Sequence, residues 1–131
     1  MESKPIYAPT AETIEALGIA ALATIPPELR VYISAVPILV VDFPDEETCA
    51  EMGLESPFDL LGLYRGVTLK NRDAGGPPSI DTIYLFRRPL LDYWCESSED
   101  LADLIRHVLI HEIGHHFGLS DADMARIEAE G

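Results

Sequence analysis

The sequence predicts an α+β fold in which a small sheet packs against helices. Short β-branched runs occupy the middle of the chain, and segments with apolar residues at helical spacing lie before and after them. Because strands and helices are grouped, a single sheet covered by helices would bury the apolar faces of both. A chain of 131 residues with 47% apolar residues suits one domain, and we expect residues 1–131 to form it.

The first half of the chain predicts two helices, a strand and an acidic connection. Thr10 is a candidate N-cap for a helix that ends before Pro26 and Pro27, and the second proline suits the first turn of another helix over 27–35. The run PILVVDF, residues 37–43, predicts a buried strand. Residues 44–59 predict a loop with a helical turn around Glu46 to Glu51.

The second half predicts two strands and two helices. LLGLYRGVTL, residues 60–69, and DTIYLFRR, residues 81–88, are strand candidates, and residues 70–79 between them have turn composition. A long helix is expected to start at a capping box of Ser97 and Asp100 and to stop at Gly118. Ser120 and Asp123 repeat the capping pattern and open a last helix over 121–130.

Charge and cysteine content exclude several classes of protein. Nine basic and 23 acidic residues give a net charge of −14, which repels phosphate backbones, so we expect no nucleic-acid partner. Two cysteines make no disulfide framework, and both are expected to be free thiols. The N-terminus does not resemble a secretory signal and no run is long enough for a membrane span, which predicts a cytoplasmic protein with no membrane partner.

All four histidines lie within the ten residues from His107 to His116. His111 and His115 are four residues apart, so a helix of about 3.6 residues per turn sets both imidazoles on one face, where they can bind one metal ion. Glu112 is rotated by about 100° from His111 and can act as a general base without displacing a ligand. H-E-x-x-H on a helix is the zincin arrangement, which predicts one bound Zn²⁺.

A catalytic zinc site needs a third protein ligand, and Asp121 is the candidate. Gly118 can reverse the chain after the helix, and Asp121 follows three residues later, completing H-E-x-x-H-x-x-G-x-x-D. Asp121 could instead favour the positive end of the last helix, in which case Asp123 or Glu128 is the alternative ligand. The apolar neighbours of the motif predict that these groups are buried, where a cluster without a metal would be costly.

The other two histidines are predicted to support the site. His107 precedes His111 by one turn and is expected in the core or behind the ligands, because a fourth protein ligand would close the site. His116 points away from His115 and suits the exposed end of the helix.

The chain resembles the small bacterial zincin-like metallopeptidases, the minimal zincin family. The resemblance rests on HVLIHEIGHHFGLSD, LLGLYRGVTL, PPSIDTIYLFRRPLL and ALATIPPEL, and covers most of the chain from about Thr10. It implies a small mixed sheet over the active-site helix, with His111, His115 and Asp121 as zinc ligands and Glu112 as the base. It also implies a peptide or protein substrate. The sequence departs from metzincins in having Asp121 as third ligand, and Met124 comes too early for a Met-turn, so we expect it in the core.

Peptide hydrolysis is therefore the predicted reaction, with Glu112 taking a proton from water that the metal activates and passing it to the leaving nitrogen. Tyr64, Tyr84, Arg65 and Arg87 are candidates for a second oxyanion donor. Thr82–Phe86 is the expected sheet edge for an extended substrate. Two alternatives remain: a metal-stabilised binding module without catalysis, and, less favoured by the charge, a metal-dependent RNA hydrolase, for which the basic residues between Arg65 and Arg88 are the argument.

Overall fold

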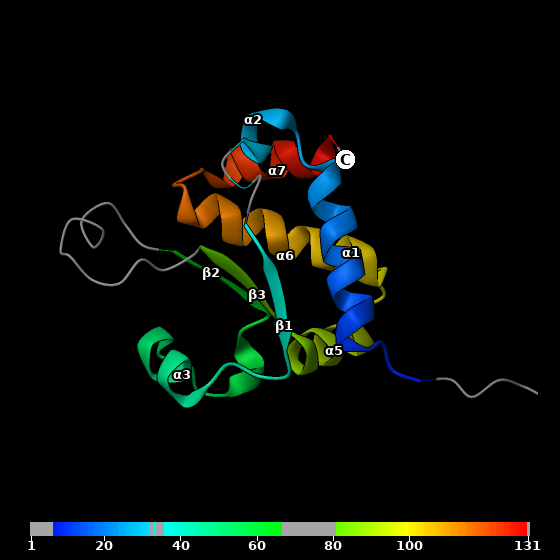
Figure 1. The fold of residues 1–131 in the computed structure, drawn as a ribbon, viewed down its shortest axis with the longest axis vertical. Helices are drawn as coiled ribbons and strands as arrows, with labels where there is room; N and C mark the ends of the chain where they lie inside the picture. Colours follow the sequence, from blue (N-terminus) through cyan, green and yellow to red (C-terminus); the bar gives the residue numbers. More distant parts are fainter. Residues whose placement is uncertain (1–6, 32, 34–35, 67–80, 131) are drawn as a thin grey trace, which may run out of the picture.

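The computed structural model describes residues 7–31, 33, 36–66 and 81–130, and its elements confirm the predicted α+β class (Figure 1). In chain order they are α1 (Ala11–Thr24), α2 (Pro27–Arg30), β1 (Ile38–Val41), α3 (Glu46–Met52), η1 (Pro57–Asp59), β2 (Gly62–Arg65), β3 (Thr82–Phe86), α5 (Arg87–Glu96), α6 (Leu101–His116) and α7 (Asp121–Ala129).

The described strands form a three-stranded mixed sheet in the order β1-β3-β2. β3 pairs in parallel with β1 and antiparallel with β2, so that Ile83 lies between Ile38 and Tyr64. The expectation that Thr82–Phe86 forms a free edge is therefore wrong, because this strand is the central one. Its alternation buries Ile83 and Leu85 completely, and a pattern of alternating burial does not distinguish a central strand from an edge strand.

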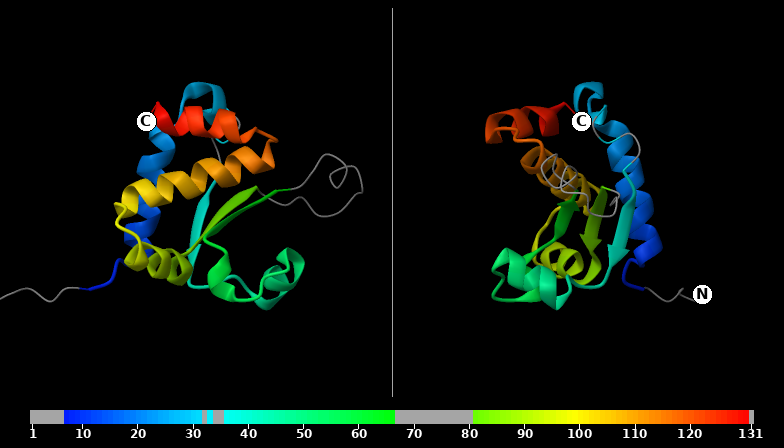
Figure 2. Two further views of the ribbon diagram at one scale, coloured as in Figure 1. Left: turned by 180° about the vertical axis from the view of Figure 1, so that it is seen from behind. Right: turned by 60° about the vertical axis from the view of Figure 1, so that its left-hand side comes forward.

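Helices α1 and α6 cover one face of the sheet, α1 over β1 and α6 over β2, and they also contact each other (Figures 1 and 2). Gly62 of β2 permits this approach, because a Cβ atom at that position would lie 2.7 Å from a methyl group of Val108 on α6. The core lies between these helices and the sheet and includes Ile14, Leu85, Leu109, Ile110 and Ile113. α6 has buried residues along most of its length.

Several element boundaries differ from the predictions. The strand expected over 81–88 stops at Phe86, and α5 follows at once; Pro89 fits its first turn, where the missing N–H has no helical partner. Ser97 is the C-cap of α5, and Asp100 rather than Ser97 caps α6, accepting hydrogen bonds from the N–H groups of Ala102 and Asp103. The second helix, expected over 27–35, ends at Arg30 with Val31 as its C-cap. Residues 32, 34 and 35 and the expected turn at 70–79 lie outside the described residues.

Other predictions are confirmed. Thr10 caps α1, a helical turn covers Glu46–Met52, Ser120 caps α7, and Met124 is completely buried. Cys49 and Cys95 are free thiols. Within the described part of the chain, every helix is too short or too polar to cross a membrane.

Candidate metal centre

Three histidines form a row on α6, one helical turn apart. The ring centroids of His107 and His111 are 4.2 Å apart, and those of His111 and His115 are 5.9 Å apart. The opposite side of the helix is apolar and buried, which fixes the direction in which this row points. The row itself lies nearer to solvent than expected, because the His111 side chain is 32% exposed and His115 is an exposed residue.

Glu112 points to the sheet instead of to α7. Its carboxylate accepts a hydrogen bond from the backbone N–H of Tyr64 on β2. Burial raises the pKa of Glu112 above its usual value, against the lowering effects of the nearby His115 and of this hydrogen bond. A carboxyl group with a raised pKa, beside the His115 imidazole and the outer edge of a strand, is suited to take and return a proton.

Gly118 reverses the chain after α6, as predicted. It has φ of 75°, the left-handed conformation that glycine adopts without a steric penalty, and Leu119 N–H donates to the carbonyl of Gly114. The reversal returns α7 along α6, with Met124 packed directly on Gly114. The carboxylate of Glu128 on α7 is thereby brought to the side of α6 that carries the histidine row.

The two ends of α7 present their carboxylates differently. Asp121, the first residue of α7, is exposed, and Asp123 is partly buried. Glu128, near the other end, has its Oε1 atom 2.8 Å from Nε2 of His111 and 2.8 Å from Nδ1 of His107. Among the described residues, the group of metal-ligand types whose atoms lie within 4.8 Å of one another consists of His107, His111 and Glu128.

This grouping does not test the ligand set of His111, His115 and Asp121, which stays a prediction. Glu128, foreseen as an alternative to Asp121, does contact one motif histidine. His107 lies beside the motif as expected, but its side chain is 51% exposed and so is not in the core. The i−4 spacing of His107 from His111 was the sequence signal for this contact.

His116 is the last residue of α6 and is exposed, as expected. It also stacks on the buried ring of Tyr64, with 3.9 Å between ring centroids. This stacking joins the end of α6 to β2, a contact that helical spacing alone could not predict.

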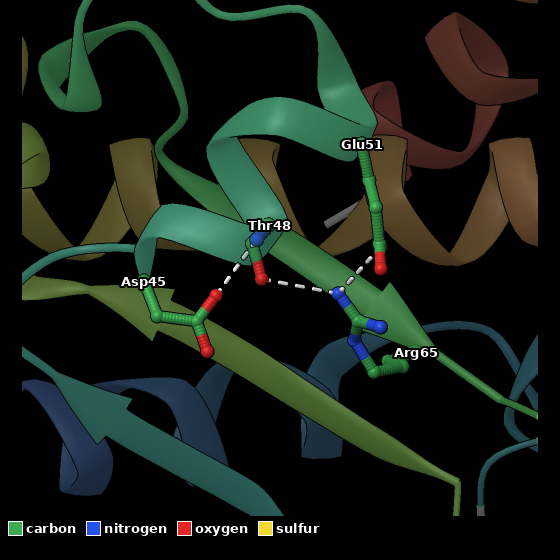
Figure 3. A network of polar contacts seen from close by, with 4 residues as sticks. All are labelled: Asp45, Thr48, Glu51 and Arg65. Atoms are coloured by element: carbon green, nitrogen blue, oxygen red, sulfur yellow. Dashed lines mark hydrogen bonds and ion pairs between the residues drawn. The ribbon is translucent and has the colours of Figure 1, made fainter.

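The structure separates the four candidate oxyanion donors. Arg65 donates to the Thr48 hydroxyl and the Glu51 carboxylate, linking β2 to α3 (Figure 3). Together with Tyr84 it lines a cavity of about 370 Å³ that contains no motif residue. Arg87 donates to the carbonyl of Pro9 and pairs with Asp42. Tyr64 is the candidate in contact with α6, and its hydroxyl donates to Asp81 over 3.0 Å.

A helix that carries H-E-x-x-H beneath a small mixed sheet, followed by a glycine reversal and a returning acidic helix, defines a protein of the zincin class. The chain belongs to the zincin-like metallopeptidase family, whose sequence profile matches residues 33–130. This match confirms the resemblance inferred from the motif, and membership implies binding of zinc. A comparison with curated proteins gave no match.

Proposed function

We propose that this protein is a zinc-dependent peptidase in which His111, His115 and Asp121 hold one zinc ion and Glu112 is the general base. The observation that carries the proposal is the position of Glu112, next to His115 in charge interaction and hydrogen-bonded to the outer edge of β2. A site with a purely structural metal has no need for a carboxyl group of raised pKa at that place.

The residues present fit a zinc ion. Two imidazoles and a carboxylate are the ligands of many catalytic zinc sites, and His111 and His115 lie on one side of a well-formed helix. Oε1 of Glu128, the alternative third ligand, lies 2.8 Å from Nε2 of His111, so a carboxylate of α7 does reach one motif histidine.

Bound zinc would supply Lewis acidity and activate a water molecule for attack on a carbonyl carbon. Glu112 would accept the proton of that water and then donate it to the leaving nitrogen. Its raised pKa favours this double role, because both the charged and the protonated forms are then accessible. The hydroxyl of Tyr64, from the adjoining strand, is the proposed second donor to the oxyanion, for which it would give up its bond to Asp81.

The proposed substrate is an extended peptide that pairs with β2, in place of the β3 edge expected at first. β2 pairs with β3 on one side, and the Tyr64 N–H on its other side meets Glu112. A peptide added along this edge would pass beside the general base and the histidine row. The acidic surface that follows from a net charge of −14 favours basic peptides over acidic ones.

The test compares wild-type protein with Glu112→Gln and Asp121→Ala. We expect Glu112→Gln to keep its zinc and to lose peptide hydrolysis, and Asp121→Ala to lose zinc more readily, as measured by elemental analysis after dialysis. Glu130→Gln is the control, since it removes one carboxylate from an exposed position of the same region. A zinc-loaded wild type that cleaves no peptide and behaves like Glu112→Gln would identify a non-catalytic metal-stabilised module instead.

A further inference from the structure

Glu128, His107 and His111 bring three potential metal ligands together beside the motif. Oε1 of Glu128 is 2.8 Å from both Nδ1 of His107 and Nε2 of His111, and the three atoms all lie within 4.8 Å of one another. Around four-coordinate zinc, bonds of about 2.0–2.2 Å keep neighbouring ligand atoms roughly 3.3 Å apart. The two distances to Oε1, 2.8 Å each, therefore come near the separation that such an ion requires.

The Oε1 atom of Glu128 is buried and accepts no hydrogen bond within the described residues, although two imidazole nitrogens are near it. The short distances are thus not accompanied by hydrogen-bond geometry. A buried carboxylate oxygen that accepts no hydrogen bond is costly. A cation held jointly by this oxygen and the two nitrogens would remove that cost.

Arg106 holds Glu128 in place. Its guanidinium donates to the backbone carbonyls of Ile127 and Glu128, over 3.2 Å and 3.0 Å, and to the hydroxyl of Thr24 on α1. These bonds hold the last turn of α7 against α6. Because Arg106 directly precedes His107, they do so beside the histidine row. Glu128 is therefore presented to the histidines by a braced helix end, which distinguishes this group from surface side chains that meet by chance.

A cavity of about 280 Å³ opens beside the group and is lined by Glu99, Asp103, Arg106, His107 and Glu128. Three carboxylates face one guanidinium there, so the cavity attracts cations. It offers a route to His107 and Glu128 that does not pass along β2.

We propose that His107, His111 and Glu128 form a second divalent-cation site, which binds zinc or another divalent ion that prefers imidazole and carboxylate ligands. It uses the Nε2 atom of His111. That the two sites exclude each other rests on the proposed function, in which His111 is a zinc ligand, and on His111 using this same nitrogen there. One ion therefore occupies either site but not both, and an ion held by Glu128 leaves the motif site with His115 and Asp121 alone.

The experiment measures Co²⁺ and Zn²⁺ binding by equilibrium dialysis. His115→Ala removes a motif ligand and leaves the second site, Glu128→Gln does the reverse, and His111→Ala removes both. We expect one ion per wild-type chain, one ion in each of the first two variants, and loss of binding in His111→Ala and in His115→Ala/Glu128→Gln. Because even an outer hydrogen-bond partner contributes roughly 10–100-fold to metal affinity, the double variant should bind at least about tenfold more weakly than His115→Ala.

Nitrogen-15 NMR of the histidine rings gives a readout independent of affinity and of activity. Zinc added to His115→Ala should shift Nδ1 of His107 and Nε2 of His111. His107→Gln replaces Glu128→Gln if the latter does not fold, and Glu130→Gln controls for the lost charge. Equal affinity of His115→Ala and the double variant would overturn the second site, and two ions bound at once to wild type would overturn the exclusion. Failure of the proposed function is distinct: Glu128→Gln would then bind no ion while His115→Ala still did.

Discussion

Met124 of α7 packs so tightly on Gly114 of α6 that a Cβ atom at position 114 would lie 2.8 Å from Cγ of Met124, and nearer still to its sulfur. Gly114 is buried within the H-E-x-x-H segment, and Met124 is completely buried. The absence of a side chain at one motif position thus sets the distance between the two helices that carry the candidate ligands.

Gly114→Ala is expected to push α7 away from α6. Overpacking of this kind costs about 1–3 kcal/mol of folding free energy, partly offset by the better helix propensity of alanine. Zinc retention should fall as well, because Asp121 and Glu128 move with α7. Combining Gly114→Ala with Met124→Ala should cost less than the sum of the two single changes, as measured by denaturant unfolding. Additive costs would show that the two residues do not compete for space.

Gly118→Ala should weaken metal binding through the backbone. Gly118 has φ of 75° and an added Cβ would meet no atom within 4 Å, so strain alone opposes the substitution. We expect a loss of about 1–2 kcal/mol in the free energy of unfolding. Gly53→Ala, at φ of 64° after α3 and equally open, is the matched control. Both variants should lose similar stability, but only Gly118→Ala should lower zinc affinity. Equal zinc affinities of the two variants would show that the chain reversal at Gly118 does not position the metal ligands.

Tyr64→Phe tests the proposed oxyanion donor. Loss of such a donor lowers kcat by roughly 10²–10³-fold, with zinc content unchanged. Tyr84→Phe is the control, because Tyr84 lines the cavity that contains no motif residue and should keep full turnover. Tyr64→Phe also loses the hydrogen bond from the hydroxyl to Asp81. The melting temperature of the variant should therefore be measured together with its kcat, to separate a loss of stability from a loss of turnover. A normal kcat in Tyr64→Phe would show that the hydroxyl bonds to Asp81 but takes no part in turnover.

Asp45, the N-cap of α3, should make the free energy of unfolding depend on pH. The backbone N–H of Thr48 donates to the Asp45 carboxylate over 2.7 Å (Figure 3). Hydrogen bonding by the Thr48 side chain and then by this N–H lowers the pKa of Asp45, with Arg65 contributing less. Because the folded pKa is depressed, the stabilisation is present above the unfolded pKa and is lost as pH falls through the folded one. Asn also caps helices, so the Asp45→Asn variant should keep α3. As pH falls from about 6 to about 2, the free energy of unfolding of the variant should rise relative to that of wild type, as measured by urea unfolding. A constant difference over that range would contradict the assignment.

The sequence predicts the helix that carries the motif, the reversal at Gly118 and the burial of Met124, because each follows from local spacing or from a single backbone requirement. It does not predict which strand is central. That depends on the pairing of β1 with β3 across more than forty residues, which alternation in Thr82–Phe86 does not encode. For the same reason spacing favours Asp121 as the partner of the histidines, whereas contact between Glu128 and His111 depends on how α7 packs along α6.

α5 was missed for a related reason. Its sequence RRPLLDYWCE contains a proline and two aromatic residues and gives a weak helical signal, and its register is fixed by the bond from Arg88 N–H to the carbonyl of Asp42 after β1. A contact between segments so distant in the chain overrides local propensity.

The edge of the sheet beside Glu112 is short. β2 contains four residues, which span about 13 Å at the usual rise along a strand. A peptide bound along this described edge could form backbone hydrogen bonds to β2 through only a few of its residues. Only the few substrate residues around the cleaved bond would then contact the protein. Selection among substrates would depend on whether the segment is unfolded and accessible more than on a long consensus sequence.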